Sequence, residues 1–112
     1  MAYVMAGPGE KIKIQDAATT GAGLVIVPAA SINYHSILIE ESDDTTSAGK
    51  IKAESAPEPD FGGTWALEGT EQTLVRFTAL QVNFVGARAA IRARISTDVT
   101  GGGKATVYYL GV

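Results

Sequence analysis

The chain has 112 residues, a length that predicts one domain, and its formal net charge of −3 argues against a dedicated nucleic-acid binder. It has no cysteine, which excludes disulfides and thiolate chemistry, and it has no apolar run long enough for a membrane-spanning helix. Thirteen glycines and 46% apolar residues fit a turn-rich all-β protein better than a helical one.

Along the chain, residues 1–10 are expected to form an extended N-terminal arm, and residues 11–112 a single domain. Alternating and β-branched residues predict about eight short strands, at residues 11–15, 24–27, 32–40, 50–54, 64–68, 73–78, 87–96 and 104–111. Lysines on the outer face of the first strand are typical of a protected edge. The regular strand spacing indicates an antiparallel β-sandwich, jelly-roll-like, with minimal helix.

Three strand pairings follow from the turns between neighbouring strands. The acidic turn after residue 40 is expected to pair the strands on either side of it, and a turn at Gly69 and Thr70 to close a second hairpin. The glycine-rich turn at residues 97–103 predicts a long final hairpin within a main sheet, because glycines accept positive φ without a Cβ penalty.

The strand at residues 32–40 carries apolar side chains on both of its faces. Ile37 and Ile39 share one face, and Tyr34 and Leu38 lie on the other together with Ile32. A sheet with a solvated back does not need such a strand. Either both faces are covered within the fold, or the second face meets a partner.

Three arginines, Arg88, Arg92 and Arg94, share one face of the predicted strand at residues 87–96, about 7 Å apart for the closer pair and about 13 Å for the wider pair. Such a row needs carboxylates, phosphates or solvent. A cross-strand ladder with glutamates of this domain and an intersubunit contact both remain open. Together with Tyr34 and Leu38, these arginines are the candidate partner-binding residues.

No catalytic, cofactor-binding or metal site is expected, and the protein is not expected to be an enzyme. His35 and Ser36 are adjacent strand residues that point to opposite faces, so they cannot form a nucleophile–base pair, and His35 fits a hydrogen-bonded strand position. The acidic residues fit a solvated turn better than a calcium loop: Glu40, Glu41, Asp43 and Asp44. A phosphate loop at Gly103 and Lys104 is excluded, because Ala105 replaces Ser or Thr and a strand follows.

Trp65, the Arg-Ala-Arg-Ile-Ser segment at residues 92–96, the glycine-rich turn and the closing Thr-Val-Tyr-Tyr-Leu-Gly at residues 106–111 resemble small tailed-bacteriophage virion proteins over roughly the last half of the chain. The resemblance implies a structural virion role, either as a head decoration (cement) protein or as a tail or fibre component. Such a protein is made in the host bacterial cytoplasm and located in the virion.

The leading expectation from this resemblance is a capsid decoration protein that stabilises the head by bridging subunits. Its partners would be the major capsid protein or other virion subunits, with no nucleic acid, membrane or cofactor involved. It would be a homo-oligomer, with a trimer favoured because decoration proteins often sit on local three-fold axes.

The alternative is a receptor- or carbohydrate-binding β-module of a tail fibre. Trp65 has three phenylalanines near it in the sequence or on neighbouring predicted elements, namely Phe61, Phe77 and Phe84, and the group suggests either core packing or a sugar-stacking platform. In the alternative, the stacking residues would include Trp65, Tyr34, Tyr108 and Tyr109.

Overall fold

The computed structural model describes residues 3–41 and 48–112, and within these ranges the chain forms strands, turns and loops without a helix. The all-β expectation is therefore confirmed. The described strands are β1 (Tyr3–Ala6), β2 (Lys11–Ala18), β3 (Gly21–Ala22), β4 (Val25–Pro28), β5 (Tyr34–Glu41), β6 (Ala48–Ala56), β7 (Ala66–Thr73), β8 (Ala79–Val85), β9 (Ala90–Thr100) and β10 (Ala105–Gly111).

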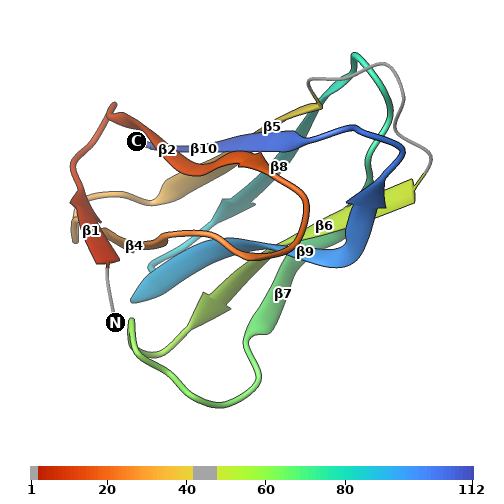
Figure 1. Cartoon of the computed structure of the whole chain (residues 1–112). Helices are drawn as coiled ribbons and strands as arrows, with labels where there is room; N and C mark the ends of the chain where they lie inside the picture. Colours follow the sequence, from red (N-terminus) through yellow and green to blue (C-terminus); the bar gives the residue numbers. More distant parts are fainter. Residues whose placement is uncertain (1–2, 42–47) are drawn as a thin grey trace.

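The strands form two sheets in a sandwich-like arrangement (Figure 1). Sheet A has the order β1-β4-β9-β6-β7, with the short β3 also paired to β9. Sheet B has the order β2-β10-β5-β8. Neighbouring strands are antiparallel except β1 and β4, which are parallel.

The main core lies between the two sheets and follows from strict alternation along the strands. Ile91, Ala93 and Ile95 of β9 are at most 4% exposed and face Ile37 and Ile39 of sheet B in one cluster. Adjacent strand residues point to opposite faces, so the residues between these positions lie on the outer surfaces. Burial of this apolar set is the main contribution to stability in a domain without disulfides.

The predicted final hairpin is wrong. β9 lies in sheet A between β4 and β6, whereas β10 lies in sheet B between β2 and β5. The glycine-rich connection, with positive φ at Gly101 and Gly102, carries the chain from one layer to the other. Each of the two strands has the apolar face that its sequence predicts. Their buried residues, such as Ile91 and Tyr109, belong to the same core but come from opposite sheets, not from neighbouring strands of one sheet.

Two further predicted pairings are wrong. β5 pairs with β10 and β8, while β6 pairs with β9 and β7, so the strands around the acidic turn lie in different sheets. The second predicted hairpin is also absent: residues 66–73 form the single strand β7, and the predicted strand at residues 73–78 is mostly the loop that leads to β8. Within β7, Gly69 has φ 66° and lies where the β6–β7 register shifts. Here the glycine with positive φ forms an irregularity within a strand. The residue type alone does not distinguish such an irregularity from a turn.

The predicted N-terminal arm is partly a strand of the fold. The described part of the expected N-terminal arm includes β1, which pairs with β4 within sheet A. β2 is an edge strand of sheet B and exposes Lys11 and Lys13, as expected. Asp43 and Asp44 of the acidic turn lie outside the described residues.

Candidate functional site

Arg92 and Arg94 lie on the outer face of sheet A and share one carboxylate of their own domain. The Glu54 side chain is 5% exposed and accepts hydrogen bonds from Arg92 Nε at 3.0 Å and Arg94 Nε at 3.2 Å. The Arg92 guanidinium also lies over the Trp65 ring, 4.1 Å from the ring centroid. The contacts are those of an intramolecular ladder, and a partner-binding role for these arginines stays a prediction.

Arg88 lies between β8 and β9 and bonds to Glu68 of β7. Its Nε and Nη2 both donate to the Glu68 carboxylate, which also accepts a hydrogen bond of 2.6 Å from the Ser55 hydroxyl. The Arg88 guanidinium holds the pKa of the Glu68 carboxyl below its usual range, and the same hydrogen bonding raises the pKa of Arg88. Because β7 and β8 are edge strands of the two sheets, this ion pair ties the layers together along one side.

Trp65 belongs to a second, smaller core on the outer face of sheet A. It is 5% exposed and packs with Val25, Ala56 and Ala90, and Phe61 packs against the same cluster. Its indole Nε1 donates to the Phe61 carbonyl at 3.1 Å. The segment between β6 and β7 therefore covers this end of sheet A, and the Trp65 ring is not available for stacking on a ligand.

The outer face of sheet B, in contrast, is not covered by any described segment. On β5 the residues His35, Ile37 and Ile39 are buried, whereas Tyr34 is 60% exposed and Leu38 is half-buried. The strand is thus two-sided, as its sequence indicates, and Tyr34 and Leu38 lie on a face that the described chain leaves open. Ile32 was expected on the same face, but it precedes β5 and is 2% exposed, so this part of the expectation is wrong.

Neighbouring strands extend the apolar character of this face in cross-strand rows. Tyr34 of β5 lies between Val85 of β8 and Val112, and each of the three side chains is 60% exposed. Leu38 lies beside Tyr108 of β10. We use the term "B face" for nine outward side chains of sheet B, without those of the β2 edge and of the end that holds Glu40, Ala79 and Thr106: Tyr34, Ser36, Leu38, Gln81, Asn83, Val85, Tyr108, Leu110 and Val112.

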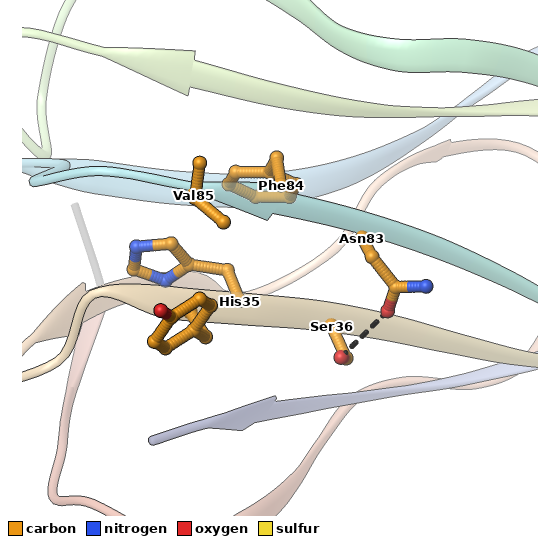
Figure 2. A pocket seen from close by; sticks show the side chains of 6 residues that line it. His35, Ser36, Asn83, Phe84 and Val85 are labelled. Carbon is orange, nitrogen blue, oxygen red and sulfur yellow. Dashed lines mark hydrogen bonds between the residues drawn. The ribbon is translucent and has the colours of Figure 1, made fainter.

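Polar side chains on the B face are hydrogen-bonded to one another along one side. Asn83 Oδ1 accepts from Ser36 Oγ and from Gln81 Nε2, each at 2.8 Å. A hollow of about 420 Å³ lies at this end of sheet B, lined by Tyr34, His35, Ser36, Asn83, Phe84 and Val85. Figure 2 shows the Ser36–Asn83 hydrogen bond joining β5 to β8 at the hollow.

Two lysines border the B face on its β2 side. Lys11 Nζ lies 4.3 Å from the centroid of the Tyr108 ring and Lys13 Nζ lies 6.0 Å from it. Lys13 also pairs with Asp16 at 3.6 Å, with both side chains exposed. The B face therefore has basic residues along its β2 edge, as expected for the polar rim of a protein interface.

His35 is a structural residue of the core. Its Nε2 lies 2.8 Å from the Gly86 carbonyl oxygen, which can only accept, so Nε2 carries the proton and Nδ1 accepts from the Tyr109 hydroxyl at 2.7 Å. Burial lowers the pKa of His35, so the neutral ring is favoured. Ser36 lies on the opposite face of β5, and the pair cannot act together in catalysis.

The acidic residues do not gather into a metal site within residues 3–41 and 48–112, where no cluster of three metal-ligating side chains is present. Glu40 is exposed, and Glu41 is buried and accepts from the Lys104 backbone N–H at 3.3 Å. Lys104 leads into β10, so a strand stands where a phosphate loop requires a helix.

Most of the B face was missed from the sequence. The sequence indicated Tyr34 and Leu38 as contact residues, but not Val85, Leu110 or Val112. The alternation in residues 106–112 was the available signal, because it separates the buried Val107 and Tyr109 from the outward positions between them. The described part of the chain holds no helix of the length and apolar character that crossing a membrane requires. Comparison with protein-family models, curated proteins and solved structures found no match.

Proposed function

We propose that the protein is a structural virion protein of a bacteriophage, a capsid decoration or cement protein that stabilises the head by bridging capsid subunits. The observation that carries this proposal is the B face, where Tyr34, Val85 and Val112 form a row of side chains that are each 60% exposed, with half-buried apolar side chains next to them. Contiguous exposed apolar surface on a small domain usually marks a contact site.

The two outer faces of the sandwich differ in a way that favours the B face as the docking surface. On sheet A, Arg92 and Arg94 meet Glu54, and Trp65 is packed. On sheet B, the tyrosines and aliphatic side chains have no such cover, and charged residues are confined to the rim. Interfaces are enriched in aromatic residues and depleted of charge at their centres.

The expected contact residues, oligomeric state and location are part of the same proposal. Tyr34 and Leu38 carry the proposed partner contact, whereas a capsid carboxylate that approached Arg88, Arg92 or Arg94 would compete with Glu54 and Glu68. We retain the homo-oligomer, with a trimer favoured, the virion location and the jelly-roll-like connectivity as parts of the same proposal.

Carbohydrate binding is a second candidate function, and the Tyr34 hollow is the observation that favours it. An exposed tyrosine ring beside the Ser36 hydroxyl and the Asn83 amide offers both stacking and hydrogen bonding to a sugar. Trp65 and Tyr109 are too buried to take part, at 5% and 0% exposed. A glycan array therefore tests this function with Tyr34→Ala, and sugar binding that this substitution abolishes would favour it over capsid docking.

The test of the decoration role is binding of the purified protein to undecorated particles, made by the phage that carries this gene after the gene has been deleted. Val85→Asp places a charge on the B face at a side chain that is 60% exposed, and Leu67→Asp makes the same change on sheet A at 51% exposure. We expect Val85→Asp to weaken binding at least about tenfold and Leu67→Asp to change it less than about twofold.

Val85→Asp falls on an exposed position of an edge strand, so its thermal melt should remain close to that of the wild type. Leu67 lies opposite Glu54 in the register, so the melting temperature of Leu67→Asp should fall, and its binding is measured well below that temperature. Equal loss of binding in the two variants would remove the B face from the proposal. No binding of the wild-type protein to undecorated particles would end the decoration role itself.

A further inference from the structure

β1 is an edge strand that completes sheet A and the main core from one side only. It pairs in parallel with β4 over its four residues, and its inward side chains Val4 and Ala6 join the core beside Ile26 of β4. The Ala6 carbonyl also accepts from the Ala29 N–H at 2.8 Å. The β4 edge therefore needs a strand with this sequence, which covers the core and pairs its backbone groups.

The connection from β1 to β2 has the composition of a hinge. It passes from sheet A to sheet B through Gly7, Pro8 and Gly9, with Pro8 and Gly9 exposed. Gly9 is fixed at the β2 end, because its N–H donates to the Gly111 carbonyl at 2.7 Å. Gly7 can act as the pivot, since glycine adopts a wide range of φ and ψ and the residue before a proline favours an extended backbone. The closed turn is held by the Glu10 carboxylate, which accepts from the Gly7 N–H at 2.6 Å.

The outward side chains of β1 are apolar and exposed. Tyr3 is 51% exposed and Met5 is 64% exposed, and they lie beside Val25 and Val27 of β4 in the register. Neither belongs to a core cluster, and no charged side chain of β1 protects this edge in the way that lysines protect β2. A second chain placed against the edge would therefore gain free energy by covering Tyr3 and Met5.

We propose that β1 is exchanged between copies of this chain, so that β1 of one subunit pairs with β4 of the next. The partner is a second copy because β1 itself is the segment that fits the β4 edge, with Val4 and Ala6 in the core. An exchanged strand makes the same contacts as one that folds back on its own chain. The two arrangements then differ only in the conformation of the hinge and in new contacts between subunits, which makes exchange a low-cost route to an oligomer.

This inference rests on the proposed homo-oligomer and assigns one of its contacts. β1 lies at the margin of the molecule beside β4, at the edge of sheet A (Figure 1), so the exchange leaves the B face of every subunit open to the capsid. The contact is head-to-tail, and repeated contacts of this kind can close into a ring, including a ring of three subunits.

Single cysteines test the exchange, because the chain has no cysteine of its own. Met5 and Val27 are partners in the register, and neighbouring strands are about 5 Å apart, within the range that a disulfide spans. Met5→Cys and a tagged Val27→Cys are mixed in equal amounts, unfolded in urea, refolded together and oxidised. Exchange brings the cysteines of different chains side by side, so disulfide-linked dimers of one variant with the other should outnumber the two kinds of like-linked dimer combined.

Lys50→Cys mixed with tagged Thr73→Cys is the matched control. These two residues are exposed partners of β6 and β7, whose pairing the inference leaves within one chain. Random collision gives as many unlike-linked dimers as like-linked dimers combined, and the control should show this proportion. Cysteine behaves as a small apolar residue, so thermal melts of Met5→Cys and Val27→Cys should remain close to that of the wild type and show that both variants refold.

Unlike-linked dimers that are no more frequent for the β1–β4 mixture than for the control would overturn the inference and show that β1 folds back on its own chain. The decoration role is tested separately by particle binding of the wild type and of Val85→Asp, so it can hold without the exchange. An excess of unlike-linked dimers together with no particle binding would support the exchange and end the decoration role.

Discussion

Arg92→Ala tests whether the arginine row of sheet A serves the fold or a partner. In the structure, Arg92 donates to Glu54 at 3.0 Å and lies over Trp65 at 4.1 Å, with 20% of its side chain exposed. The sequence alone left a partner contact open, and in that case the substitution would weaken assembly more than it lowers the melting temperature. The observed contacts give the opposite expectation.

The magnitude follows from the contacts that are lost. A hydrogen bond between charged groups contributes about 1.5–3 kcal/mol, and a partly desolvated cation–π contact about 0.5–2 kcal/mol. Glu54 keeps its bonds to Arg94, so the carboxylate is not left alone and the larger penalty for an orphaned buried charge does not apply. The two contributions add to about 2–5 kcal/mol, and because 20% of the Arg92 side chain is exposed to solvent we expect the free energy of unfolding to fall by an amount at the lower end, about 2–3 kcal/mol.

That loss is large enough to read in a thermal melt. With an unfolding entropy of about 2.1 cal/mol/K per residue, a loss of about 2–3 kcal/mol in a chain of 112 residues corresponds to about 8–13 °C in melting temperature. Calorimetry and particle binding should be measured on the same samples. A melting temperature of Arg92→Ala within about 2 °C of the wild type, together with loss of particle binding, would contradict the intramolecular role and indicate that Arg92 contacts a partner.

Two other predictions concern the buried His35 group. Burial holds the pKa of His35 below its usual 6.5, so the unfolded chain binds the proton first. The contribution of neutral His35 to the free energy of unfolding is therefore fully present above about pH 6.5, and it is lost as the pH falls below that value, by at most about 1.4 kcal/mol per pH unit. Urea melts of the wild type and of His35→Gln at pH 7.5 and 5.5 should show a larger loss of stability in the wild type. Tyr109→Phe removes the hydroxyl that donates to Nδ1 and should lower the free energy of unfolding by about 1–2 kcal/mol in urea melts; an unchanged midpoint would contradict this hydrogen bond.

Local patterns predicted most of the long strands, with the exception of β8, but not the partners of those strands. The alternation of Ile91, Ala93 and Ile95 reports which side of β9 is buried, and that inference is correct. It carries no information on whether β10 lies beside β9 or opposite it, because both arrangements bury the same face. The glycine-rich connection predicts a hairpin turn, but glycines are equally suited to a connection that passes from one sheet to the other.

The candidate site was predictable to a similar degree. The two apolar faces of β5 indicated an open or partnered surface, and Tyr34 and Leu38 lie on it. The full B face depends on cross-strand register, which brings Val85 and Val112 to either side of Tyr34 from distant parts of the chain. Register is a long-range property, so residue type alone did not reveal these neighbours.

The edges of sheet B explain why a partner is expected on its face and not along an added strand. β2 at one edge carries the exposed Lys11 and Lys13, and its pairing with β10 has register shifts, two features that oppose strand addition. β8 at the other edge ends at Val85, just before Gly86, where φ is 106°, and the following Arg88 is bonded across to Glu68 of sheet A. With one edge charged and irregular and the other tied to the opposite layer, the exposed apolar side chains of the B face remain the part of sheet B on which a subunit can gain binding energy from desolvation.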